Sequence, residues 1–405
     1  MEQDFVEQFL LLTQGARTPA LFRLWGALFL LAASLERRVW IANGDGIVYP
    51  NLYVLLVAPP GTGKFIIEAT KTLLAETVLP NSLTPAFKLA PDSMTNAALI
   101  DTLADSTRTF LPPRGGAPLK YNSLAVLQEE FSIMMPKYDM EYIGTLNGIF
   151  SNKAKHEERR RHGPHQKTLI EKPQLNILSG VQPSYLASLF PDEAWSTGLS
   201  RRLFMVYSSE TPKFSLFHKS DVPRGLRQQL LDELSLLSVA YGEMAWTPDA
   251  MDKVDSWYMG GEKPVPEHSK LQYYCRTRGE FALKLSLLAS LSRSRSDMTI
   301  RDEDVERALG WMLEAERVMP DIFRAMVGRS DKDVLEELHT YMFAKFGTDR
   351  RPVRLEDIKR FLLTRVPHEK IDSLVKAGEG AGLWTYVAGN PELWVPKARI
   401  GVGLE

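Results

Sequence analysis

The most constraining feature of this sequence is a glycine-rich turn placed between a short apolar run and a helical pattern. Residues 53–57 read Tyr-Val-Leu-Leu-Val, which is typical of a strand buried on both faces. Residues 58–65 read Ala-Pro-Pro-Gly-Thr-Gly-Lys-Phe, and a helical pattern extends from about residue 64 to residue 79. A strand, a glycine-rich turn and a helix N-terminus in this order form a cradle for phosphate groups. We therefore expect nucleotide binding; the plainer alternative is the same turn without a ligand.

The expected phosphate loop has one unusual position. Gly61 and Gly63 permit backbone angles that aim successive N–H groups at phosphate oxygens, and Lys64 reaches the terminal phosphates as a point charge. The residue after this lysine is usually Ser or Thr, whose hydroxyl binds Mg²⁺. Phe65 has no oxygen, so we expect nucleotide to bind with weak or absent hydrolysis. The predicted nucleotide contacts are Pro60, Gly61, Thr62, Gly63, Lys64 and Phe65.

Two carboxylates, Glu129 and Glu130, follow the apolar run at residues 124–127. In a doubly wound sheet, ligands gather at the carboxyl ends of the strands, so this strand end is expected beside the phosphate loop. The first carboxylate can then order Mg²⁺ through water, and the second can polarise the attacking water as a general base. The alternative is two exposed glutamates at a helix start, where the helix dipole favours them.

Two further strands carry polar side chains with possible roles in phosphate chemistry. Asn176 lies in the run at residues 175–178, where its amide can hold a water or a phosphate oxygen. Arg201 and Arg202 stand directly before the run at residues 203–207. An arginine offered to a neighbouring subunit's nucleotide stabilises the charge that spreads over the transferred phosphoryl group. The alternative for both arginines is a solvated surface position.

The order of these motifs resembles an AAA+ ATPase. More narrowly, residues 49–64 are similar to the helicase-like ATPases of phages and mobile elements, which are distant relatives of the minichromosome maintenance helicases. The resemblance covers about residues 20–320. It implies an α/β fold with a P-loop NTPase core and a parallel sheet, a helical lid, and a hexameric ring with ATP at the subunit boundaries.

The resemblance also assigns roles by position. It makes Glu129 the residue that orders Mg²⁺, Glu130 the catalytic acid, Asn176 the first sensor and Arg202 the arginine finger that acts on a neighbouring subunit. Arg278 matches the second sensor at the start of a lid helix, with Arg276 as its competitor. The implied cofactors are ATP and Mg²⁺, and Phe65 departs from the family pattern.

A basic segment lies between the acidic strand end and Asn176. Residues 153–172 hold seven Lys or Arg against three Glu, and residues 159–170 are expected to form a hairpin that turns at Gly163. In the resembling helicases an insertion at this place points into the ring channel and grips DNA. The alternative is a solvated basic loop. The predicted DNA contacts are Lys155, Arg159, Arg160, Arg161, His162 and Lys167.

Four segments are expected along the chain: an N-terminal helical segment at 1–45, the ATPase core at 46–221, a helical lid at 222–330 and a small unit at 331–405. The last segment reads as three helices followed by a strand hairpin, which is the order of a winged helix. Winged helices bind duplex DNA or dock proteins, and both alternatives stay open here.

Composition limits the location and the partners. The net charge of −1 over 405 residues argues against coating nucleic acid with the whole surface. The single cysteine, Cys275, excludes an intrachain disulfide and a cysteine-based metal site. The longest apolar run, at residues 24–35, is shorter than the about 20 residues of a membrane span. These features favour a cytosolic protein with no membrane partner, and the resemblance to phage and mobile-element ATPases implies the cytoplasm of a bacterial host.

Together these features predict an ATP-driven, ring-forming DNA helicase or translocase of a phage or mobile element. Its partners would be single-stranded or forked DNA, further copies of itself and other replication proteins. A nucleotide-gated helicase loader or ring scaffold is the first alternative, because Phe65 favours weak hydrolysis. A DNA-binding regulator that uses ATP as a switch is the second.

Overall fold

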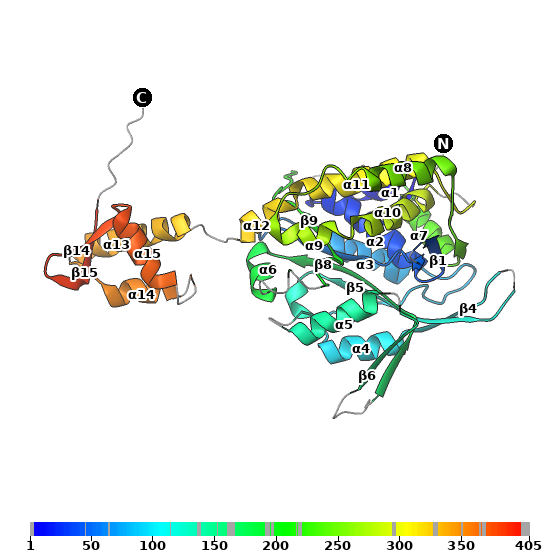
Figure 1. The fold of residues 1–405 in the computed structure, drawn as a ribbon, viewed down its shortest axis with the longest axis horizontal. Helices are drawn as coiled ribbons and strands as arrows, with labels where there is room; N and C mark the ends of the chain where they lie inside the picture. Colours follow the sequence, from blue (N-terminus) through cyan, green and yellow to red (C-terminus); the bar gives the residue numbers. More distant parts are fainter. Residues whose placement is uncertain are drawn as a thin grey trace. The chain divides into compact units, whose positions relative to one another are not determined.

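The computed structural model divides the chain into two compact units, Met1–Met326 and Val327–Glu405 (Figure 1). The structure describes residues 4–44, 46–63, 65–113, 115–135, 139–151, 153–159, 167–190, 195, 198–215, 217, 221–293, 297–326, 331–349, 351–363, 366 and 370–397. Each unit has its own hydrophobic core. The segments predicted separately at 1–45, 46–221 and 222–330 differ from this division, because they share the core of the first unit.

A five-stranded sheet forms the centre of the first unit, with the strand order β4-β5-β8-β3-β9. These strands are β4 (Thr107–Phe110), β5 (Leu119–Gln128), β8 (Pro173–Val181), β3 (Tyr53–Val57) and β9 (Leu203–Tyr207). Neighbours from β5 to β9 pair in parallel, and β4 pairs antiparallel at the edge. β3 is buried at every position, as its apolar run predicts. The expectation of an α/β fold with a mainly parallel sheet is confirmed.

Helices cover both faces of this sheet. Figure 1 shows α2 (Ala20–Leu35) and α3 (Ile66–Glu76) on one side and α4 (Asn96–Asp105) and α5 (Met140–Phe150) on the other. The apolar run of α2 is buried along its whole length, because this helix packs against β3, β8 and β9 and also against other helices. Among the described residues, no helix combines the length and apolar character needed to cross a membrane.

The N-terminal segment, predicted to be helical over residues 1–45, also contains a strand. α2 ends at Leu35, because Glu36 adopts a left-handed backbone angle (φ +51°), and residues 39–43 form β1 (Val39–Asn43). β1 pairs with β2 (Gly46–Val48) and β10 (Gly242–Glu243) in a small separate sheet.

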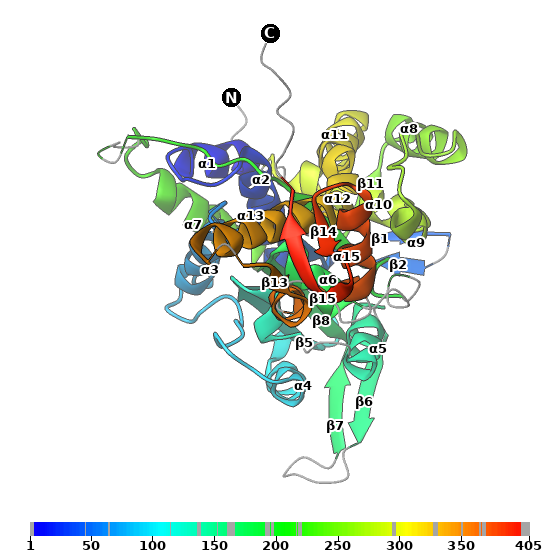
Figure 2. The same cartoon turned by 90° about the vertical axis from the view of Figure 1, so that its left-hand side faces the viewer.

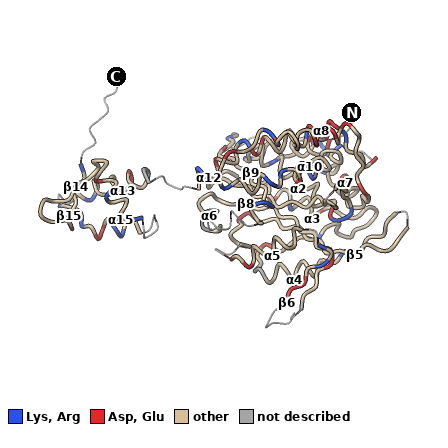
Figure 3. Tube along the Cα trace, in the orientation of Figure 1, with Lys and Arg blue, Asp and Glu red and all other residues tan. Residues whose placement is uncertain are grey.

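The segment predicted as a lid is helical, and it belongs to the first unit. Its helices are α7 (Leu226–Leu237), α8 (Pro248–Met259), α9 (Gln272–Cys275), α10 (Arg278–Leu291), α11 (Asp302–Val318) and α12 (Pro320–Met326). Two short strands, β11 (Ala245–Trp246) and β12 (Thr299–Ile300), pair in parallel within it. α10 packs against α11 and also contacts α2, so the helices of this segment extend the central core. Both basic and acidic residues occur along these helices (Figure 3).

The basic segment contains two antiparallel strands, β6 (Lys155–Arg159) and β7 (Lys167–Glu171). Their register pairs Lys155 with Glu171 and Arg159 with Lys167, so a hairpin is present, but its first described strand ends at Arg159, where the predicted hairpin begins. Its turn, predicted at Gly163, lies outside the described residues. The two strands extend away from the rest of the first unit (Figures 1 and 2).

The second unit begins at Val327, four residues before the predicted boundary. Its elements are α13 (Asp331–Asp349), β13 (Val353–Arg354), α14 (Leu355–Leu363), α15 (Ile371–Gly380), β14 (Trp384–Val387) and β15 (Asn390–Pro396). The predicted order of three helices and a hairpin is confirmed, and the short strand β13 was not foreseen. Trp384 is fully buried in the core and donates its indole N–H to the Val375 carbonyl (3.0 Å).

Candidate nucleotide site and arginine cavity

The glycine-rich loop begins where β3 ends, at the carboxyl edge of the sheet. Gly61 and Gly63 have φ angles of +81° and +74°, so both positions require the conformational freedom that the sequence predicted for them. Thr62 is buried, and its hydroxyl donates to the Pro59 carbonyl (2.9 Å). Lys64, the predicted phosphate-binding lysine, lies outside the described residues.

The N-terminal segment braces this loop, which the sequence did not reveal. The Thr18 hydroxyl donates to the Gly63 carbonyl (2.8 Å). A Cβ atom at Gly63 would lie 1.9 Å from the Arg17 carbonyl oxygen, so only glycine fits between the loop and this segment. Residues more than forty positions apart therefore fix the loop conformation.

The exposed residues of the loop carry no side-chain oxygen that could bind a ligand. Pro60 and Gly61 are exposed, and Phe65, directly before α3, is 60% exposed. An exposed aromatic ring at the start of this helix offers neither a hydroxyl nor a charge. Any metal bound here has to rely on other residues.

The two predicted carboxylates, Glu129 and Glu130, follow β5 at the same edge of the sheet as the loop. Gln128, the last residue of β5, pairs with Ser179 of β8, and Ser179 pairs with Leu55 of β3. Glu129 is exposed, and Glu130 is partly buried just before a short 3-10 helix (Phe131–Ile133). The sequence prediction brought these side chains to the correct edge because parallel strands end together.

The prediction for Asn176 is wrong in position. Asn176 lies near the start of β8 and is 1% exposed, and its side-chain oxygen accepts the Leu52 N–H (2.9 Å). This bond fixes the entry to β3 at the edge opposite the loop. The amide that follows β8 at the loop's edge belongs to Gln182, since Val181 pairs with Val57. The Gln-Pro pair that precedes a helix was the available sequence signal.

Arg202 also lies at the edge opposite the loop, directly before β9. Leu203 pairs with Tyr53, the first residue of β3, whereas the loop follows Val57, the last one. Five residues of strand separate the two levels by about 16 Å, at about 3.3 Å per residue. Arg202 therefore lies far from the glycine-rich loop of its own chain.

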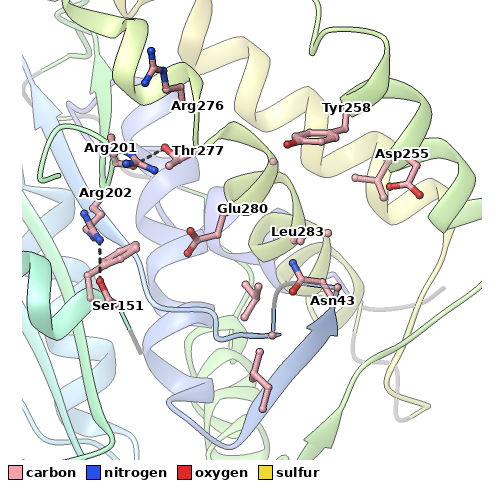
Figure 4. Close-up of a pocket in the computed structure, with 17 residues that line it drawn as sticks. Asn43, Ser151, Arg201, Arg202, Asp255, Tyr258, Arg276, Thr277, Glu280 and Leu283 are labelled. Carbon is pink, nitrogen blue, oxygen red and sulfur yellow. Dashed lines mark hydrogen bonds between the residues drawn. The ribbon is translucent and has the colours of Figure 1, made fainter. Parts of the chain in front are cut away.

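A cavity of about 650 Å³ opens beside Arg202 (Figure 4). Arg201, Arg202 and Arg276 line it together with Glu280 and Tyr258. Arg201 and Arg276 are exposed. The Thr277 hydroxyl, at the start of α10, donates to the Arg201 carbonyl (2.8 Å), so α10 contacts the residues that precede β9 at this cavity. Three arginines around one cavity favour an anionic ligand.

The Arg202 guanidinium is already held on one side. Nη1 donates to the Gly198 carbonyl (2.8 Å) and to Asn147 Oδ1 (3.4 Å), and Nη2 donates to Ser151 Oγ (2.8 Å). Burial lowers the pKa of Arg202 below its usual value, and the neighbouring charge of Arg201 lowers it further. An arginine with this little solvation gains more from an incoming anion.

The prediction for Arg278 needs correction. Its side chain is fully buried, and Nη2 pairs with Glu316 Oε2 (2.6 Å) while Nε donates to Oε1 of the same carboxylate (2.8 Å). Nη1 and Nη2 also donate to the backbone carbonyls of Glu262 and Pro264, so the buried guanidinium has no exposed surface for a nucleotide. Arg276, the competing candidate, is the exposed one and lines the cavity.

The predicted DNA contacts lie on the hairpin and are described only in part. Lys155 is exposed on β6, and the backbones of Arg159 and Lys167 form the last described pair of the hairpin. The remaining three, Arg160, Arg161 and His162, lie outside the described residues.

Neither a protein-family model nor a curated protein matches this chain. Among the described residues, no group of three or more His, Cys, Asp or Glu side chains is arranged to hold a metal ion.

Proposed function

We propose that this chain is an AAA+ ATPase that assembles into a ring and drives DNA unwinding or translocation for a phage or mobile element. One observation carries the proposal: the loop that would bind the nucleotide and Arg202 lie at opposite edges of one sheet. An arginine that cannot reach the nucleotide of its own chain can act only on a nucleotide bound by an adjacent copy. A closed ring places such a copy at every interface.

The loop residues fit a nucleotide's phosphates. The left-handed angles of Gly61 and Gly63 are those of a loop that turns its N–H groups inward, and α3 adds the partial positive charge of its N-terminus. Lys64 would supply the point charge on the terminal phosphates. ATP, when bound, supplies the phosphoryl group whose transfer to water releases free energy.

Four residues of the chain would then act on the attacking water and the developing charge. Glu130 would accept a proton from the water as general base, and Gln182 would orient it by hydrogen bonding from the same edge. Arg202 of the adjacent copy would stabilise the negative charge on the transferred group. Arg276, which lines the cavity with Arg202, would add a second positive charge there.

The fit to Mg²⁺ is partial. Glu129 can order the ion through water, but Phe65 replaces the hydroxyl that usually coordinates it. The metal site would therefore have one protein ligand fewer than usual, and slow hydrolysis is the expected result.

The basic hairpin would hold single-stranded DNA in the ring channel. β6 and β7 extend from the body of the first unit and carry Lys155, Arg159 and Lys167, and repetition around a ring multiplies these phosphate contacts. The second unit has the element order of a winged helix. Its exposed Arg354, Arg360, Lys370 and Lys376 suit either duplex DNA or an acidic protein partner.

A subunit-mixing experiment tests the ring. The variants Lys64→Ala and Arg202→Ala should each lose ATP hydrolysis and strand displacement. Equal mixing should restore hydrolysis, since about a quarter of the interfaces of a random ring then pair an intact loop with an intact arginine. A mixture as inactive as either variant would contradict action across the interface. Strand displacement by the wild type that disappears with Lys64→Ala supports the motor.

Phe65 favours a second candidate function, a nucleotide-gated helicase loader or ring scaffold. This alternative predicts nucleotide-dependent oligomerisation without strand displacement. The variant Phe65→Thr restores a hydroxyl at this position and should raise the steady-state ATPase rate about tenfold or more. Equal rates for the wild type and Phe65→Thr would show that the missing hydroxyl does not limit hydrolysis.

A further inference from the structure

We propose that Asn147 and Ser151 are positioning residues that connect Arg202 to the basic hairpin. In this arrangement, an anion that draws Arg202 into the cavity releases the end of α5 and with it the root of β6. The inference rests on the proposed function, because the anion is the terminal phosphate group of a nucleotide held by an adjacent copy.

The contact between Arg202 and α5 is specific. Ser151 caps the C-terminus of α5, and its hydroxyl donates to the Asn147 carbonyl (2.8 Å) while it accepts from Arg202 Nη2 (2.8 Å). Asn147 Oδ1 accepts from Nη1 (3.4 Å). A Cβ atom at Gly198 would lie 2.4 Å from Nη1, so this glycine leaves the space in which the guanidinium lies.

The end of α5 is directly continuous with the hairpin. Ser151 is four residues before Lys155, the first residue of β6. Gly148 of α5 faces the His156 ring, since a Cβ atom at this glycine would lie 3.5 Å from the ring. The Lys172 N–H donates to the Ala154 carbonyl (2.9 Å) and closes the base of the hairpin. A displacement of α5 therefore reaches β6 through both the chain and this packing.

An incoming phosphate competes for the same donors. Ser151 and Arg202 both line the cavity, and Figure 4 shows the Arg202–Ser151 bond at its border. A phosphate pairs two opposite charges with the guanidinium and can accept from both of its nitrogens, whereas the oxygens of Ser151 and Asn147 are neutral. The phosphate therefore displaces Ser151 and Asn147 as acceptors. Glu280, which also lines the cavity, is kept in place by the buried Lys284 (2.9 Å) and does not bind Arg202 in their stead.

Hydrogen–deuterium exchange on the full chain tests the connection. In the wild type, adding ATPγS and Mg²⁺ should accelerate amide exchange at residues 151–159. The variant Ser151→Ala should show roughly three- to tenfold faster exchange there without nucleotide, and added nucleotide should change it little. Ser151→Thr keeps an acceptor hydroxyl and should behave as the wild type. The matched control is Ser373→Ala, which removes a hydroxyl that bonds only within its own part of the second unit.

Two results would overturn the proposal, and they differ from a failure of the proposed function. If residues 151–159 of Ser151→Ala exchange as slowly as in the wild type without nucleotide, the contact between Ser151 and Arg202 does not stabilise the base of the hairpin. If added nucleotide still accelerates amide exchange at residues 151–159 in Ser151→Ala, the contact between Ser151 and Arg202 does not transmit the effect of the nucleotide. Binding of a fluorescent ATP analogue is measured in parallel, with Lys64→Ala as the non-binding reference. Absent binding in the wild type removes the proposed function and this coupling together, whereas binding and assembly without a change at 151–159 removes the coupling alone.

Discussion

The ammonium group of Lys284 donates to both the backbone carbonyl (3.0 Å) and the side-chain oxygen (3.1 Å) of Asn51. Lys284 belongs to α10 and is fully buried, and Asn51 lies two residues before β3. The Asn51 amide donates in turn to the Phe150 carbonyl at the end of α5 (3.2 Å). One buried lysine therefore joins α10, the segment that leads into β3 and the helix that precedes the hairpin.

Replacing this lysine should destabilise the first unit. Lys284→Met keeps much of the side-chain volume but leaves the oxygens of Asn51 buried without a donor and removes the partner of Glu280. We expect a loss of about 2–3 kcal/mol in the free energy of unfolding, measured by urea titration with tryptophan fluorescence.

The control for this substitution is Lys253→Met. Lys253 is 36% exposed and pairs with Glu306 at the surface (3.0 Å), so its loss should cost at most about 1 kcal/mol. A similar cost for the two substitutions would contradict a structural role for the buried lysine.

The ion pair between Glu280 and Lys284 predicts a pH dependence. The positive charge of Lys284 lowers the pKa of Glu280 below its usual value of about 4.5. A carboxylate whose pKa is lower in the folded state stabilises the fold above pH 4.5 and loses this contribution as the pH falls through the folded pKa. The stability difference between wild type and Glu280→Gln should therefore be largest at neutral pH and shrink below pH 4.5. A difference that does not change between pH 7 and pH 3 would exclude this pair as the cause.

The two loop glycines should respond differently to alanine. Both have positive φ angles, which cost about 1–2 kcal/mol for any other residue. A Cβ atom at Gly61 meets nothing within 4 Å, whereas at Gly63 it meets the Arg17 carbonyl. Gly63→Ala should therefore break the Thr18 bond to the loop and lower both stability and nucleotide binding further than Gly61→Ala does. Thermal unfolding and binding of a fluorescent ATP analogue measure the two effects, and equal losses would argue against the brace.

The second unit should unfold independently of the first. A Cβ atom at Gly378 would lie 1.9 Å from the Trp384 ring, which is fully buried. Gly378→Ala should therefore destabilise this unit by about 3 kcal/mol, while the first unit keeps its transition because the two cores are separate. Calorimetry of the full chain shows which transition moves. Gly380→Ala is the control, since nothing lies within 4 Å of its added Cβ, and an equal shift in both transitions would contradict independence.

Much of the fold could be predicted because its signals are local. The apolar runs at β3, β5, β8 and β9, the basic hairpin and the order of elements in the second unit all follow from residues adjacent in the chain. The carboxylates at Glu129 and Glu130 were brought to the correct edge for the same reason, since a parallel strand that is correctly placed also fixes where its next residues lie.

Residues whose roles depend on register were harder to assign. Asn176 lies in the predicted strand, but level with the residue before β3, whereas the loop follows the last residue of β3 at the opposite edge of the sheet. Arg278 and Arg276 are two residues apart, yet Arg278 is buried in a bidentate pair with Glu316, whereas Arg276 is exposed and lines the cavity. Arg276 lies before α10, which begins at Arg278, so the period of that helix does not set the direction of the Arg276 side chain.

The sequence by itself determined that a glycine-rich loop joins a buried strand to a helix. The apolar run and the two glycines with positive φ angles are adjacent in the chain, so local sequence is enough to predict them. Only the tertiary structure decided what surrounds that loop and the arginines. The brace from Thr18, the contact between Lys284 and Asn51, and the hold of Ser151 on Arg202 each join residues at least 45 positions apart. Such contacts depend on how the helices pack across the sheet, and packing is a property of the whole core.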